Sequence, residues 1–319
     1  MIRPSAIAIL SLAAHPAAGD FSLRFPVDCT VGTNCYIQHL VDLDPGATVQ
    51  DFRCGDLSYD GHKGTDIALP SLAAQAAGVA VIAAAAGTVI GVRNDMEDAL
   101  QFGPAAPDIV NRECGNGVVI KHTQGYETQY CHLAKGSVTV NSGQQVQAGT
   151  PLGQIGLSGK TQFPHLHFSV RHNGAVVDPF DTVDARQCDD PLDPLWARVP
   201  ETPAGGLISI GMHDGVPHYQ EVKAGTADTV LTSSGPAMVG WAFVYMARKG
   251  DILTTQITGP DRVYVSHSEL IKRDQAQLYR ASGRRTPADG WPAGDYLLEV
   301  ELVRGDTVLD REIHTFHID

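Results

Sequence analysis

The sequence predicts an all-β protein of two domains. Short runs of β-branched and aromatic residues, separated by glycine-containing turns, fill residues 61 to about 180 and recur after residue 206. Neither part shows a convincing helical period. We expect antiparallel sheets with barrel-like packing in residues 20–188, a proline-rich linker over 189–206, and an immunoglobulin-like β-sandwich over 207–319.

The composition limits the classes of function. A chain of 319 residues that is 43% hydrophobic can build its own cores without relying on disulfides. Its 36 acidic and 23 basic residues give a net charge of −13, whereas a nucleic-acid-binding protein carries a basic face. We therefore expect no nucleic-acid partner, and a monomeric protein.

The amino terminus predicts export. Arg3 is a short positive region, residues 6–14 are an apolar run, and Ala17, Ala18 and Gly19 form a small-residue cleavage site. This pattern is typical of a secretory signal peptide, which we place at residues 1–19. The mature protein is then expected in the periplasm or cell envelope.

A second apolar stretch has a different interpretation. No charged residue lies between Asp66 and Arg93, and this length is sufficient to cross a membrane. The stretch is rich in alanine and has three glycines, however, which makes a weak lipid-facing surface. We interpret it as two short buried strands around a glycine turn, and expect no transmembrane segment in the mature form.

The six cysteines predict disulfides, because export leads to an oxidising compartment and an even number can pair completely. Cys114 and Cys131 lie at the edges of two strands joined by a short turn, so they are placed to be cross-strand neighbours. The pairing of the other four has no such support. The pairs we name are Cys114–Cys131, Cys29–Cys35 and Cys54–Cys188.

Two short patterns predict a metal site. His165 and His167 are two apart on an expected strand, so both side chains point to the same face. His62 and Asp66 are four apart, and Gly64 allows the backbone between them to bend. Either pair alone also fits an ordinary polar surface. With one histidine of the first pair on the metal and the other beside the metal-bound water, the two pairs offer two histidine ligands and one carboxylate with an open fourth position, the pattern of catalytic zinc.

Three ordered segments give a resemblance to a known family. GHKGTD, YCHL and PHLHF, with a glycine-rich hairpin before the third, resemble the LytM/lysostaphin-like zinc metallopeptidases of peptidase family M23. The resemblance covers roughly residues 60–180. It implies one zinc ion per chain with ligands His62, Asp66 and His167, and His132 and His165 as the catalytic pair.

The resemblance also implies a reaction and a substrate. Zinc activates water, and histidines near the metal can take its proton and stabilise the tetrahedral intermediate. We expect His165 to be the nearer base and His132 to orient water or stabilise the intermediate. The implied substrate is the peptide cross-link or stem peptide of bacterial peptidoglycan. Two alternatives are a catalytically silent wall-binding or regulatory protein that kept this fold, and a peptidase for protein substrates.

Overall fold

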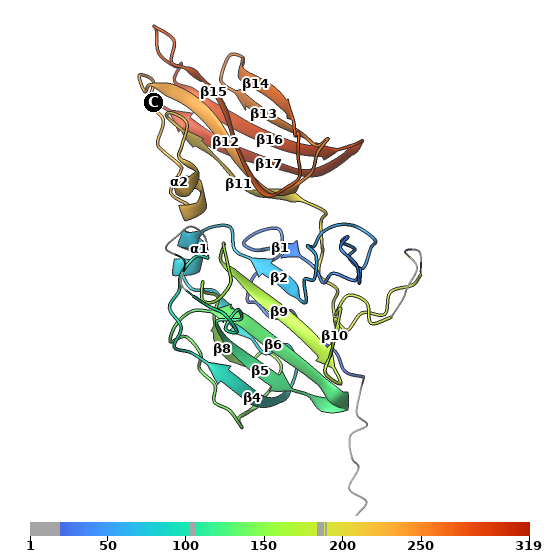
Figure 1. Cartoon of the computed structure of the whole chain (residues 1–319). Helices are drawn as coiled ribbons and strands as arrows, with labels where there is room; N and C mark the ends of the chain where they lie inside the picture. Colours follow the sequence, from blue (N-terminus) through green and yellow to red (C-terminus); the bar gives the residue numbers. More distant parts are fainter. Residues whose placement is uncertain (1–19, 102–105, 107, 184–187, 189) are drawn as a thin grey trace, which may run out of the picture.

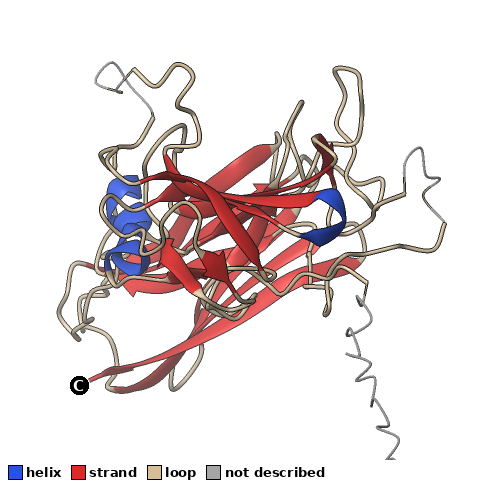
Figure 2. Ribbon diagram, turned by 90° about the horizontal axis from the view of Figure 1, so that it is seen from below, coloured by secondary structure: helices blue, strands red, loops and turns tan. Residues whose placement is uncertain are grey.

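Two β domains stacked on each other make up the computed structural model, which describes residues 20–101, 106, 108–183, 188 and 190–319. The expected signal peptide lies outside these residues. Strands dominate the described part of the chain, and the few helical turns are short (Figures 1 and 2). The all-β expectation is therefore confirmed.

The N-terminal domain is built on one eight-stranded antiparallel sheet with the order β1-β2-β9-β6-β5-β4-β7, and β10 pairs with β9. Strands β1 and β7 end this order, so within the described residues the sheet is open and not a closed barrel. The strands are β1 (Tyr36–His39), β2 (Thr65–Ala68), β4 (Gly87–Arg93), β5 (Asn116–Lys121), β6 (Tyr126–Leu133), β7 (Gln145–Val146), β9 (His165–His172) and β10 (Ala175–Val177).

The uncharged stretch after Asp66 folds mostly as short strands. It contains the end of β2, strand β3 (Ala80–Ile82), which pairs with β8 (Pro151–Gln154), and nearly all of β4. Between them lies a helix that we did not expect, α1 (Leu72–Ala76), capped by the Ser71 side chain. A 3-10 turn, η1 (Thr123–Gly125), joins β5 to β6. In the described part of the chain, no helix is long and apolar enough to cross a membrane.

The C-terminal domain is a sandwich of two antiparallel sheets with the orders β11-β12-β15 and β14-β13-β16-β17. Its core is formed by inward side chains of both sheets, such as Ala242 and Leu278 from one and Ile257 and Leu298 from the other. The strands are β11 (Gly206–His213), β12 (Ala237–Ala247), β13 (Ile252–Thr258), β14 (Val263–Leu270), β15 (Gln275–Arg285), β16 (Gly294–Arg304) and β17 (Thr307–Ile318).

The two domains share part of one core. Phe243 and Tyr245 of β12 belong to the same buried apolar cluster as the N-terminal domain, and the short helix α2 (Tyr219–Ala224) lies against α1 at the boundary (Figure 1). Within the expected linker, Trp196 is buried against Phe168 and Phe180. That part of the segment is core rather than spacer, and the C-terminal domain does not rely on its own core alone.

Three disulfides staple the N-terminal domain, and they join Cys29 to Cys35, Cys54 to Cys188, and Cys114 to Cys131. The last of these lies next to His132, whose backbone N–H donates to the Cys114 carbonyl at 2.8 Å. The disulfide therefore holds the end of β6 in place beside the candidate site.

Replacing both Cys114 and Cys131 with alanine should lower the free energy of unfolding by about 3 kcal/mol, because the bond closes a 17-residue loop in the unfolded chain. Urea denaturation of the variant and the wild type measures this difference. Cys29→Ala with Cys35→Ala opens a loop of only 6 residues and should cost less. A larger loss from the shorter loop would contradict the expectation.

Candidate active site

The site lies on one face of three neighbouring antiparallel strands. His39 of β1 is opposite Asp66 of β2, and Asp66 is opposite His167 of β9. Residues opposed across adjacent strands place their side chains on the same face of a sheet. The intervening Leu166 and Phe168 of β9 point to the other face, where they are completely buried in the core.

His62 joins this row from the loop before β2, and a glycine makes its approach possible. A Cβ atom at Gly64 would lie 2.7 Å from two ring atoms of His167, a separation that real side chains do not adopt. Any larger residue at position 64 would therefore push His167 away from His62. This is a steric reason for glycine in the middle of the HKGTD segment.

Three ligand atoms converge at this point. Asp66 Oδ1 lies 2.8 Å from His167 Nδ1 and 3.2 Å from His62 Nε2, and the two histidine nitrogens are 3.2 Å apart. Donors 2.0–2.1 Å from a tetrahedral zinc ion are about 3.4 Å from one another. Two imidazoles and a carboxylate at this spacing fit zinc in both chemistry and separation.

The outer hydrogen bonds fix which nitrogen of each ring faces the site. His62 Nδ1 lies 2.6 Å from the Leu40 carbonyl, which only accepts, so Nδ1 carries the proton and Nε2 is free to bind a metal. His167 Nε2 donates to Ser169 Oγ at 3.0 Å, and that hydroxyl donates to the Lys63 carbonyl. The lone pair of His167 is therefore on Nδ1, toward Asp66.

His39 is a site residue that the sequence pattern did not indicate. Its Nδ1 lies 3.2 Å from Asp66 Oδ2, the carboxylate oxygen that does not face the other two ligands, and its ring packs edge-on against Tyr59. Partners of this kind orient a ligand and are part of a metal site. Only the pairing of β1 with β2 places His39 here, and no local motif encodes that pairing.

We expect His39→Ala to weaken zinc binding by about 10- to 100-fold, because Asp66 loses the partner that orients it. Competition with a chromophoric chelator measures the change. His39→Asn can still donate a hydrogen bond and should recover part of the affinity. His317→Ala is the matched control, because it removes another histidine–aspartate pair, with Asp295, far from the site. Equal affinity for His39→Ala and wild type would contradict this role.

The two remaining histidines lie beside the three ligand atoms. The rings of His132 and His165 are 4.7 Å apart, and His165 Nε2 is 3.6 Å from Asp66 Oδ1. His132 reaches the site because its backbone is left-handed, with φ of 65°, which breaks the alternation of β6. Non-glycine residues in this conformation are strained and often belong to functional sites.

Both histidines present an unprotonated nitrogen to the site. Nδ1 of His132 donates to the Ser158 carbonyl at 2.8 Å, and Nδ1 of His165 donates to the Phe163 carbonyl at 2.9 Å. Burial lowers the pKa of His165, and burial with the nearby His165 and His167 holds the pKa of His132 well below its usual value. At neutral pH both are uncharged, with the lone pair on Nε2.

Asp66 stays ionised at the centre of this group. Its burial favours the neutral form, but the interaction with the His62 ring and the hydrogen bond from His39 to its Oδ2 outweigh burial and hold its pKa well below the usual range. For His62, burial favours loss of the proton, yet the Asp66 charge raises the pKa overall. Metal binding at His62 therefore competes with a proton and should weaken as the pH falls.

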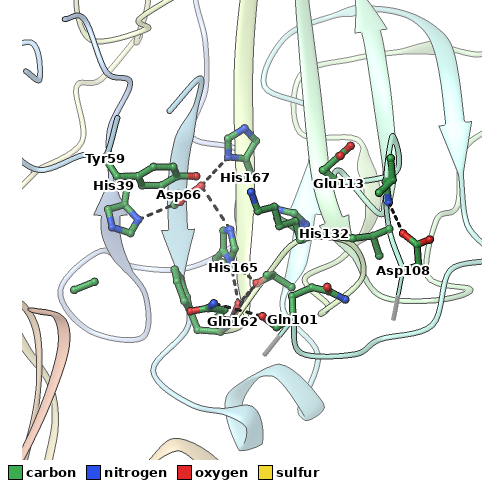
Figure 3. Close-up of a pocket in the computed structure, with 16 residues that line it drawn as sticks. His39, Tyr59, Asp66, Gln101, Asp108, Glu113, His132, Gln162, His165 and His167 are labelled. Carbon is green, nitrogen blue, oxygen red and sulfur yellow. Dashed lines mark hydrogen bonds and ion pairs between the residues drawn. The ribbon is translucent and has the colours of Figure 1, made fainter. Parts of the chain in front are cut away.

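A cleft of about 690 Å³ opens over these side chains (Figure 3). His39 and Tyr59 lie on one side of the central histidines, and Asp108 and Glu113 lie on the other. Tyr130, two residues before His132 on β6, is fully buried in the core and does not line the cleft. Clefts of this size with converging polar groups are typical of substrate sites.

The far side of the cleft comes from the long loop between β4 and β5. Asp98 anchors the described part of this loop by accepting hydrogen bonds from the backbone N–H groups of Lys135 and Leu157. The Asn116 side chain accepts a hydrogen bond from the Met96 N–H and donates one to the Met96 carbonyl. These hydrogen bonds fix the start of the loop in place beside the cleft.

The comparisons with known proteins cover this part of the chain. Residues 60–179 match the sequence model of peptidase family M23. "Uncharacterized lipoprotein YgeR" of Escherichia coli is 29% identical over 149 residues, which are 47% of this chain and 47% of that protein. "Peptidoglycan DD-endopeptidase ShyA" of Vibrio cholerae is 34% identical over 117 residues, 37% of this chain and 22% of that protein. The chain thus matches about half or less of each of these relatives.

A solved structure is also similar to part of the chain. The catalytic domain of the M23 protein EnpA from Enterococcus faecalis is 24% identical, with a TM-score of 0.33, and the match covers 50% of this chain and 96% of that one. All five histidine and aspartate positions named from the sequence motifs lie within the residues that match the family model.

Proposed function

We propose that this protein, whose residues 60–179 match the model of peptidase family M23, is an exported zinc metalloendopeptidase that cleaves peptide cross-links in bacterial peptidoglycan. The convergence of His62 Nε2, Asp66 Oδ1 and His167 Nδ1 within 4.8 Å of one another carries the proposal. The name of the Vibrio cholerae relative, a peptidoglycan DD-endopeptidase, supports the substrate class.

The chemistry needs a metal and a base. When bound, zinc supplies a Lewis acid for the scissile carbonyl and lowers the pKa of its water to about 7. The base must be uncharged and within reach of that water. His165 fits this role, since its unprotonated Nε2 faces the ligand Asp66 at 3.6 Å.

His132 then has a narrower role than the sequence suggested. Its Nδ1 proton is committed to the Ser158 carbonyl, so its Nε2 can only accept a hydrogen bond while the ring is neutral. A group that only accepts can orient the attacking water but cannot donate to the developing oxyanion. We therefore assign water orientation to His132 and proton transfer to His165.

Mass spectrometry of digested peptidoglycan tests the proposal. The purified protein should release muropeptides whose masses identify a cleaved peptide bond, chelation should stop the release, and added zinc should restore it. If the protein held one zinc per chain and released nothing, the hydrolase proposal would fail in favour of a silent wall-binding protein. Digestion of casein without digestion of peptidoglycan would instead indicate a protein substrate.

A further inference from the structure

The C-terminal domain contacts the edge strand of the catalytic sheet directly beside the cleft. The Gln38 side-chain amide on β1 donates to the Ala276 carbonyl of β15 at 3.0 Å, and Tyr36 packs on Tyr245 with ring centroids 4.7 Å apart. Figure 1 shows this domain lying over the β1 side of the sheet. Strand β1 is buried along its whole length, although it is an edge strand.

A β-bulge at Gln38 allows β1 to place Ile37 in the core and His39 in the site. The pairing shifts from Ile37 opposite Ile67 to His39 opposite Asp66, so Gln38 is the extra residue. Because adjacent residues of β2 point to opposite faces, Ile37 enters the core while His39 turns to Asp66. Bulges of this kind re-aim side chains next to active sites. Here the bulged residue is the one that the C-terminal domain holds.

The interface has the character of a fixed contact rather than a hinge. Phe243, Tyr245 and Met246 are buried in the cluster that continues into the N-terminal core. At its rim, Arg248 pairs with Asp56 at 3.0 Å. Large apolar interfaces between domains suppress their relative motion. The position of β15 relative to the cleft is therefore set by packing.

Strand β15 reaches the cleft itself. Ala276 is exposed and lines it together with His39, Tyr59 and Phe163. Ala276, Tyr59 and Phe163 have no ionised side chain, whereas Asp108, Glu113 and Lys160 line other parts of the cleft. The end next to the C-terminal domain thus offers aromatic faces and one methyl group. It is suited to an uncharged peptide residue with a small side chain.

We propose that the C-terminal domain forms one wall of the substrate cleft, and that Ala276 sets the width of its uncharged end. The substrate peptide then contacts both domains, and Ala276 is a specificity-determining residue. This inference rests on the proposed peptidase function. It assigns the C-terminal domain a role in the active site rather than in remote anchoring.

Ala276→Trp tests the wall, because the larger side chain fills the uncharged end without touching the metal ligands. Four quantities are measured on the full chain: the zinc content, the melting temperature, and the dissociation constant and kcat/KM for a purified cross-linked muropeptide. We expect zinc content and melting temperature to match the wild type. The dissociation constant should rise and kcat/KM should fall by at least about tenfold, mostly through KM.

Ser266→Trp is the matched control, since it adds the same side chain at an exposed position of β14 in the same domain. It should leave all four measurements unchanged. If Ala276→Trp bound and cleaved the muropeptide as the wild type does, the proposal that the C-terminal domain forms a wall of the cleft would be wrong, while the peptidase proposal would stand. If the wild type bound the muropeptide but did not cleave it, the peptidase proposal would fail, and the comparison of dissociation constants would still decide the wall.

Discussion

Asp66→Asn should remove zinc from the protein and abolish peptidase activity with it. Asp66 is the central ligand of the site, because its Oδ1 faces His62 and His167 and its Oδ2 faces His39. Asparagine keeps the shape but loses the charge that attracts the metal. Loss of an outer partner costs about 10- to 100-fold in affinity, so loss of a ligand should cost more than about 100-fold. Zinc competition and muropeptide release measure the two effects.

Asp178→Asn is the matched control for this experiment. Asp178 is another buried carboxyl of the same domain, and burial raises its pKa to about 7. Asparagine there can still accept the hydrogen bond from the Phe180 N–H. Zinc content and activity should be unchanged. If Asp66→Asn bound zinc as tightly as the wild type does, the metal would be held elsewhere.

The parts of the site that could be predicted from the sequence are those that local geometry fixes. The two-residue spacing of His165 and His167 puts both on one face of any strand, and Gly64 allows His62 to approach Asp66. The structure brings the side chains of His62, Asp66, His165 and His167 together. Likewise, alternating apolar runs predicted the strands of both domains, because period-two burial depends only on neighbours in the chain.

The parts that could not be predicted depend on which strands pair. His39 meets Asp66 only through the register of β1 with β2 and the bulge at Gln38, and neither leaves a local pattern. The contact of Gln38 with Ala276 joins residues 238 apart in the chain. Helices α1 and α2, with 5 and 6 residues, are also too short to show a helical period.

His165→Ala should keep the zinc and lose the activity. The residue is not one of the three converging ligands, and its Nε2 faces the site as an acceptor. Removing a positioned general base costs about 10²- to 10⁴-fold in rate, so kcat should fall by that factor. His132→Asn should also lower kcat, and asparagine tolerates the left-handed backbone at this position, where φ is 65°. Steady-state kinetics with zinc analysis of each variant measures both.

A variant that carries both His132→Asn and His165→Ala shows whether these two residues act together or independently. If His132 orients the water whose proton His165 accepts, each depends on the other, and the double variant should be little slower than His165→Ala alone. Independent roles would instead multiply the two losses. His172→Ala, on the same strand as His165 but outside the residues that line the cleft, is the matched control and should retain wild-type kcat. Loss of zinc from His165→Ala would contradict its assignment as the base and make it a ligand.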